Sequence, residues 1–171
     1  DPEGYFLEFE RFEPHEENEH LLPALERLQP LYPNPSADSS RPPELGVRAT
    51  ILWLYYLDTT AANRFYTEIL AAGPIVDQGW AWAHQASPSG FIGIVDGERG
   101  LHQATDEKGV TVSLFVDDVD AWFEYIKGAA GFELRSDEIG DESGHVRVFV
   151  GYDPEGYFLE WDTFLDVVGN E

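Results

Sequence analysis

The chain has 171 residues, and its 33 Asp and Glu against 10 Lys and Arg give a formal net charge of -23 at pH 7. This charge excludes nucleic acids and anionic membrane surfaces as partners, because both would be repelled at every approach. The sequence contains no Cys, which excludes disulfides, thiolate nucleophiles and cysteine metal sites.

Hydrophobic residues make up 43% of the chain and aromatic residues 14%, which is enough for the packed core of a soluble globular protein. No apolar run approaches the roughly 18 residues that a membrane-spanning helix needs, and no charged and then apolar leader opens the chain. We therefore expect a cytoplasmic protein.

The chain opens with the sequence DPEGYFLE over Asp1–Glu8, which recurs unchanged over Asp153–Glu160. Each copy predicts a tight turn at Asp-Pro, a permissive Gly and then a strand. A carboxylate inside such a strand faces solvent, a counter-charge or a cavity. The first copy has no module before it. We expect either that the chain is the C-terminal part of a longer protein or that this strand pairs with a sheet edge, for example on another copy of the domain.

After this first copy, apolar positions at helical spacing predict a short helix within Glu13–Leu28, with Pro23 suited to its first turn. Five prolines and several serines in Gln29–Leu45 predict a stiff polar linker. We expect residues 1–46 to form an orphan strand, a short helix and this linker, residues 47–165 to form one domain, and residues 166–171 to be a tail.

Within residues 47–165 the same order of elements comes twice. The first round predicts a strand at Val47–Leu57, a helix from Asp58 or Thr59 to about Ala72, and strands at Ile75–Asp77, Gly79–His84 and Phe91–Val95. The second predicts a strand at Val110–Val116, a helix at Val119–Ala129, and strands at Phe132–Arg135, His145–Val150 and Tyr157–Phe164. The predicted fold class is α+β, with two βαβββ modules that form a curled mixed sheet around a cavity.

The turn and strand DPEGYFLEW at Asp153–Trp161 resembles the final strand of the vicinal oxygen chelate superfamily, which contains glyoxalase I, extradiol dioxygenases and bleomycin-resistance proteins. The segment Asp58–Tyr66 is similar to the first helix of that family, and the resemblance extends over Val47–Phe164. It implies two modules around a shared cavity.

The resemblance also implies four metal-binding positions, one early in the first strand and one in the last strand of each module. In this sequence they fall at Ile51, Gly93, Thr111 (or Val110) and Glu160. Ile and Gly have no donor atom and Thr is a poor ligand, so one position of four is retained. We therefore expect no cofactor, with a divalent metal at Glu160 as the alternative.

Side chains alternate between the two faces of a strand, which predicts those that face the cavity. The predicted lining is aromatic with a few polar groups: Trp53, Tyr55, Trp80, Trp82, His84, Thr111, Ser113, Phe115, His145, Arg147 and Glu160. Such a lining is typical of pockets for planar or amphipathic small molecules. The alternative is that the aromatic rings fill this face as core, and that both histidines are solvated turn residues.

We expect Arg147 and Glu160 to meet across the concave face, either as a structural ion pair or as a substrate clamp. His102 follows a turn and is expected in the loop between the modules. Two functions remain open. The preferred one is a small-molecule-binding protein with a degenerate metal site, as a homodimer or associated with an upstream copy of the domain. The other is a metal-dependent lyase, isomerase or dioxygenase that uses Glu160 as metal ligand or general base, with missing ligands from His84, His102, a partner chain or an upstream domain.

Overall fold

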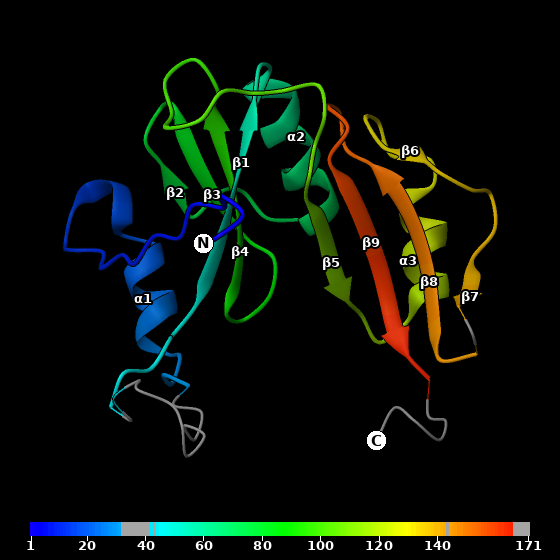
Figure 1. Ribbon diagram of the computed structural model, residues 1–171, viewed down its shortest axis with the longest axis horizontal. Helices are drawn as coiled ribbons and strands as arrows, with labels where there is room; N and C mark the ends of the chain where they lie inside the picture. Colours follow the sequence, from blue (N-terminus) through cyan, green and yellow to red (C-terminus); the bar gives the residue numbers. More distant parts are fainter. Residues whose placement is uncertain (32–41, 43, 143, 166–171) are drawn as a thin grey trace.

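The computed structural model describes residues 1–31, 42, 44–142 and 144–165. Two mixed sheets lie next to each other, and one long helix packs against each of them (Figure 1). In the described residues no helix is long and apolar enough to cross a membrane.

The first sheet has the order β1 (Thr50–Tyr56), β4 (Gly90–Asp96), β3 (Ala81–Gln85) and β2 (Val76–Asp77), with helix α2 (Thr59–Leu70) after β1. The second has the order β5 (Thr111–Phe115), β9 (Phe158–Phe164), β8 (Val146–Tyr152) and β6 (Glu133–Leu134), with β7 (Gly140–Glu142) also on β8 and helix α3 (Val119–Ile126) after β5. In both sheets the first strand of the module pairs in parallel with the last. The two predicted βαβββ modules are confirmed, although their sheets are not closed into one curled sheet.

Both long helices begin at the aspartates that the sequence indicates. The carboxylates of Asp58 and Asp118 each accept a hydrogen bond at 2.9 Å, from the backbone N–H of Ala61 and of Ala121. Each cap satisfies a backbone donor that the first helical turn leaves free.

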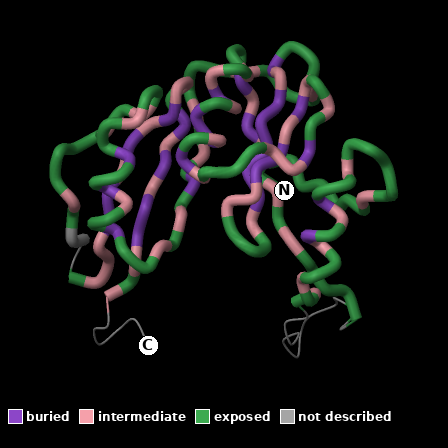
Figure 2. Tube along the Cα trace, turned by 180° about the vertical axis from the view of Figure 1, so that it is seen from behind, coloured by how far each residue is buried: buried purple, intermediate pink, exposed green. Residues whose placement is uncertain are grey.

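A single hydrophobic core joins the two modules, because α2 and α3 bury their apolar faces in the same cluster. Trp161 is fully buried there, and its ring stacks on that of Phe149 at 5.1 Å between centroids. The rings of Phe65 on α2 and Phe132 before β6 stack at 6.3 Å and so connect the modules. Figure 2 shows the buried positions concentrated in the strands.

The turn at Asp153 to Tyr157 fastens the second module to the end of β1. The Asp153 carboxylate accepts hydrogen bonds from the hydroxyls of Tyr56, at 2.6 Å, and Tyr66, at 3.2 Å. Glu155 accepts from the backbone N–H groups of Leu57 and Asp58 at 2.8 and 2.6 Å. The turn of one module therefore holds the strand end and the helix start of the other.

Asp153 is only 4% exposed, and this burial raises the pKa of its carboxyl, whereas hydrogen bonds, first that from Tyr56, act against the rise. Burying a carboxylate is costly unless its oxygens are hydrogen-bonded. The two phenols and the backbone N–H groups of Glu155 and Tyr157 supply those bonds.

The first copy of the repeat forms the same turn but no strand. Asp1 accepts from the backbone N–H groups of Glu3 and Tyr5, as Asp153 does from Glu155 and Tyr157, and the glycines of the two turns have φ values of 92° and 89°. The strand expected after the first turn is absent, because no neighbouring strand in the described residues pairs with it. Local sequence thus determines the turn, whereas the strand depends on β5 and β8 at either side.

The predicted short helix is present as α1 (Leu21–Glu26), preceded by a 3-10 turn at Glu16–Asn18. Leu21 is fully buried against the concave face of the first sheet, in a cluster with Val76, Ala83 and Phe91. Most of the predicted linker and all of the predicted tail lie outside the described residues.

On β3 the face prediction is wrong. Trp82 and His84 pack on the helix side, where His84 Nε2 lies 3.0 Å from Asn63 Oδ1 of α2 and burial lowers the pKa of His84 to about 4. Trp80 lies outside the cavity, with the Arg99 guanidinium 5.6 Å from its ring centroid. The small Ala81 and Ala83 take the concave side instead, and Ala83 packs there in a cluster with the bulky Leu21 and Trp53.

On β8 the alternation is also offset by one residue, which moves every side chain to the other face. Arg147 donates to Asp120 of α3 at 2.7 Å, so it does not meet Glu160 across the concave face. Phe149 packs under α3, and the valines of this strand take the concave side. The error has a physical cause: the concave side also buries apolar residues here, such as Val148 at 8% exposure, so apolarity did not distinguish the faces.

We predict that Asp153→Ala lowers the free energy of unfolding by about 3 kcal/mol, because it leaves two phenols without their acceptor. The matched control is Asp1→Ala, which removes the same local turn bonds at an exposed site and should cost no more than about 0.5 kcal/mol. Urea denaturation of the two variants measures both values. Equal, small losses would show that Asp153 does not hold the modules together.

Candidate functional site

Of the aromatic residues that the sequence assigns to the concave face of the first sheet, Trp53 and Tyr55 lie on it. Ile51 and Trp53 on β1 face this side, whereas Leu54 and Tyr56 face the helices. Trp53 lies beside Gly93 on β4, and the backbone register pairs them directly. A Cβ atom at Gly93 would lie 2.0 Å from the Trp53 ring. The ring therefore occupies the space that a side chain at this position would need.

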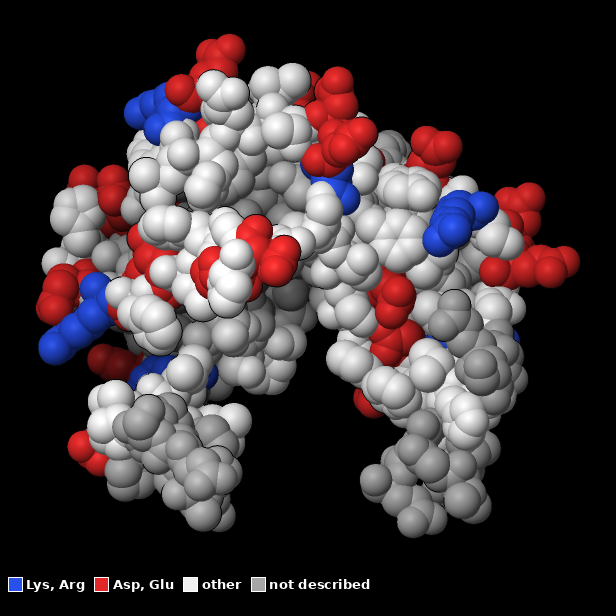
Figure 3. All heavy atoms as spheres, viewed as in Figure 1, with Lys and Arg blue, Asp and Glu red and all other residues white. Residues whose placement is uncertain are grey.

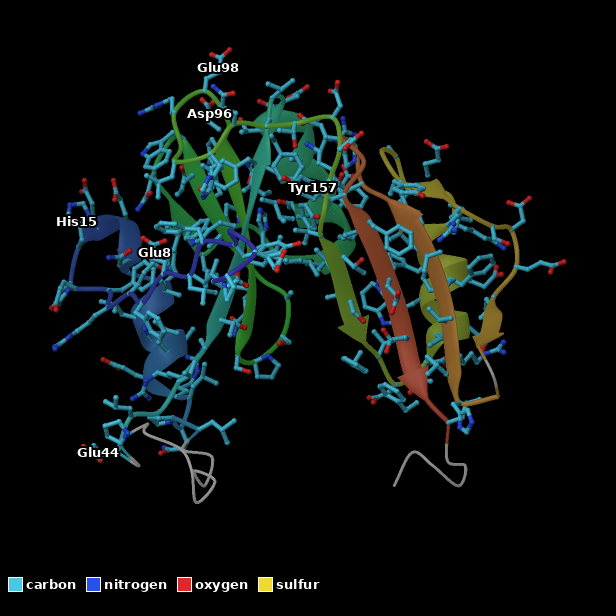
Figure 4. The ribbon with its side chains drawn as sticks, in the orientation of Figure 1. Glu8, His15, Glu44, Asp96, Glu98 and Tyr157 are labelled. Carbon is cyan, nitrogen blue, oxygen red and sulfur yellow. The ribbon has the colours of Figure 1, made fainter. Side chains whose placement is uncertain are left out.

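A cavity of about 1270 Å³ opens on this face, between the sheet, α1 and the N-terminal segment, which we define as residues 4–12. Its walls include Trp53, Tyr55 and Tyr157 from the modules. Figure 1 shows the N-terminal segment crossing in front of the first sheet, and Figure 4 shows Glu8 on this side of the sheet, with Tyr157 where the two modules meet. The segment thus covers the concave face of one module.

Contacts along its length hold the N-terminal segment in place. The Tyr5 hydroxyl donates to the Gly109 carbonyl at 3.4 Å. Phe6 makes an edge contact with His102 at 5.6 Å, and His102 makes another with Tyr55 at 5.2 Å. Phe12 packs against the same buried cluster as Ile51 and Trp53. His102 lies in the loop between β4 and β5, as expected, and joins the segment to the cavity wall.

Two carboxylates of this segment reach the cavity. Burial raises the pKa of Glu10, the negative charge of Glu8 raises it further, and a hydrogen bond with Trp53 acts against the rise. The pKa of Tyr55 is raised by burial and next by the charge of Glu8. Both glutamates line the same cavity as Trp53 and Tyr55.

The basic side chains of the cavity lining are engaged elsewhere. Lys108 Nζ lies 3.8 Å from Glu155 Oε2 and 4.6 Å from the centroid of the Tyr157 ring. Arg11 Nε lies 3.1 Å from Glu13 Oε1. Arg48 donates to the backbone carbonyl of Leu28. In the described part of the chain no Lys or Arg forms an ion pair with Glu8 or Glu10. The cavity therefore has an acidic side without a counter-charge from those residues.

The second sheet carries a separate polar group on its concave face. Ser113 and Glu160 are register partners, and the Ser113 hydroxyl lies 3.5 Å from a Glu160 oxygen. The same hydroxyl donates to Asp162, which is only 2% exposed. Phe115 and Phe164 stack at 5.4 Å beside this group and remain largely exposed.

The four positions implied for a metal do not fit one. Ile51 and Gly93 have no donor atom, and Trp53 covers the space at Gly93. Thr111 is exposed on β5, at the strand start. Among residues 1–31, 42, 44–142 and 144–165, no three His, Asp or Glu side chains come close enough to hold a metal ion.

The predicted lining residues therefore separate into three groups. Trp53 and Tyr55 lie in the cavity of the first sheet. Thr111, Ser113, Phe115 and Glu160 lie on the concave face of the second sheet. The others lie on neither concave face. Trp82, His84 and Arg147 lie on the helix side of their sheets, Trp80 lies beside Arg99, and His145 directly precedes β8.

Sequence reasoning missed Glu8, Glu10 and Tyr157 as parts of the cavity, and Asp162 as the acid beside Glu160. One signal was available. The repeat aligns Glu8 with Glu160 and Glu10 with Asp162, so both copies carry two acids on alternate residues, on one face of an extended chain.

Comparisons with solved structures find the same architecture. A glyoxalase/bleomycin resistance protein from Albidiferax ferrireducens T118 matches with a TM-score of 0.54 and 19% identity over 66% of this chain and 96% of that chain. A glyoxalase/bleomycin resistance protein/dioxygenase from Nocardioides matches with a TM-score of 0.59 and 22% identity over 76% and 88%. A glyoxalase/bleomycin resistance protein/dioxygenase family enzyme from Burkholderia phytofirmans PsJN matches with a TM-score of 0.58 and 18% identity over 67% of this chain and 97% of that chain.

No protein-family model matches the chain, and a search of curated proteins finds no match. Identities below a quarter show the fold alone, so the activities of these proteins do not carry over. The chain has the glyoxalase/bleomycin resistance protein/dioxygenase fold, which is the fold that its resemblance to the vicinal oxygen chelate superfamily implies.

Proposed function

We propose that this protein binds a small molecule in the cavity of the first sheet and does so without a metal. The observation that carries the proposal is the position of Trp53, whose ring lies over Gly93 where the fold's metal-dependent members need a ligand side chain. An aromatic wall under an open cavity suits a planar or amphipathic ligand.

The size of the cavity supports this function. Its volume of about 1270 Å³ exceeds the roughly 300–1,000 Å³ typical of pockets for small molecules, so a ligand of moderate size fits with room for water. The alternative, a metal-dependent enzyme that uses Glu160, has less support, because the described residues bring no three metal-binding side chains together.

In this proposal residues 1–46 serve the domain formed by residues 47–165, because α1 and the N-terminal segment cover its cavity. Association of two copies, or of this domain with an upstream copy, stays a prediction. It would leave the cavity on the first sheet in place if the contact involved the second sheet, where Phe115 and Phe164 are 67% and 57% exposed.

We predict that the neutral aromatic probe 2-naphthylmethanol binds to the wild-type protein and that Trp53→Ala weakens its binding about tenfold or more, through loss of stacking and apolar contact. Trp80→Ala is the matched control, because Trp80 is a partly exposed tryptophan outside the cavity and its loss should change the affinity less than twofold. Fluorescence titration gives both constants. Equal affinities of the two variants would contradict the proposed site.

We also predict that elemental analysis of the purified protein finds well below one Zn, Ni, Fe or Mn per chain, because two of the four expected ligand positions hold Ile51 and Gly93. The same elemental analysis is made on Glu160→Ala and on the control Glu98→Ala. Glu98 is an exposed acid away from the concave face that carries Glu160. About one metal per chain, lost in Glu160→Ala but kept in Glu98→Ala, would favour the enzyme instead.

A further inference from the structure

The proposed function leaves the chemical class of the ligand open. We propose that the cavity of the first sheet selects organic cations that carry an apolar or aromatic body, and that the N-terminal segment provides this selectivity through Glu8 and Glu10. The inference rests on the proposed function, since it concerns the same cavity.

Glu8 and Glu10 both line the cavity of the first sheet. They lie close enough together for the charge of Glu8 to raise the pKa of Glu10, in addition to the larger effect of burial. Two carboxylates in such surroundings repel each other, and a cation between them relieves the repulsion. The described residues provide no Lys or Arg ion pair for either glutamate. A bound cation would fill that role.

The aromatic wall of the cavity also suits a cation. Trp53 and Tyr55 are both partly exposed within the cavity, and an ammonium group is attracted to the face of such rings. Glu8 and Glu10 line the same cavity as these two rings. Carboxylates and ring faces therefore favour the same kind of ligand group at the same place.

The cavity lining offers little to a ligand of the opposite charge. The basic residues of the lining already have acceptors, namely Glu155 for Lys108, Glu13 for Arg11 and the Leu28 carbonyl for Arg48. An anion would have to compete for these groups while lying near two uncompensated carboxylates. The net charge of -23 adds a long-range attraction for cations, and Figure 3 shows acidic side chains on both halves of the molecule.

The test uses three probes with one naphthalene body: the cation (2-naphthylmethyl)trimethylammonium, the neutral 2-naphthylmethanol and the anion 2-naphthylacetate. Titrations compare the wild-type protein with Glu8→Gln/Glu10→Gln. The control Glu16→Gln/Glu98→Gln makes the same change in net charge at two exposed positions outside the cavity. Circular dichroism and thermal melts confirm that each variant is folded.

We expect the wild-type protein to bind the cation at least about tenfold more tightly than the neutral probe. The Glu8→Gln/Glu10→Gln variant should lose about tenfold in affinity for the cation and less than twofold for the neutral probe, whereas the control variant should keep the wild-type order. Added salt should weaken binding of the cation alone.

The outcomes separate the two proposals. Binding of the neutral probe in a Trp53-dependent way, with no preference for the cation or no effect of the double variant, would overturn the cation selectivity and leave the proposed function standing. Failure of all three probes to bind, or binding that Trp53→Ala does not weaken, would overturn both.

Discussion

The contact between Asp153 and two tyrosines is the constraint on which the rest of the molecule depends. The carboxylate is buried beneath Tyr56 of β1 and Tyr66 of α2, which belong to the other module. Its burial is tolerated because phenol and backbone donors satisfy its oxygens. This contact fixes the end of β1, and with it the neighbouring Tyr55 of the cavity wall. The Tyr157 hydroxyl completes the connection by donating to the Tyr55 carbonyl at 3.1 Å and accepting from its N–H at 2.9 Å.

The same eight residues have two different fates in this chain, which separates local from tertiary causes. Both copies form the Asp-Pro-Glu-Gly turn, so the turn follows from the sequence alone. Leu159 in the second copy is fully buried within a sheet, whereas Leu7 in the first is 67% exposed and belongs to no strand. The strand was therefore predictable only where flanking strands were also recognised.

Much of the fold could be predicted because its signals are local. Asp58 and Asp118 mark helix starts, and the duplicated order of elements gives the two modules. The faces of β3 and β8 could not be predicted, since alternation leaves two choices and both sides of each sheet bury apolar residues. The contact of Glu10 with Trp53 also depends on how a distant segment folds back, and no local pattern encodes that.

The metal positions of the candidate site could be predicted from the sequence, whereas the packing around them could not. A resemblance to metal-binding modules indicates where ligands belong, and the sequence alone shows that Ile51 and Gly93 cannot serve. The surroundings of Gly93 are a matter of packing: the Trp53 ring occupies the space that a side chain there would need, and the N-terminal segment lines the same cavity as Trp53. The two halves of the molecule thereby differ, with an aromatic cavity on one sheet and the Glu160, Ser113 and Asp162 group on the other.

The central claim is that the ligand site lies on the first sheet under the N-terminal segment, and hydrogen exchange measured by mass spectrometry tests it most directly. Saturation with (2-naphthylmethyl)trimethylammonium should slow exchange in peptides that contain β1 and residues 5–12, because the ligand holds them together. Peptides that contain β5 and β9 should exchange as in the free protein. Protection confined to β5 and β9, around Glu160, would contradict the account.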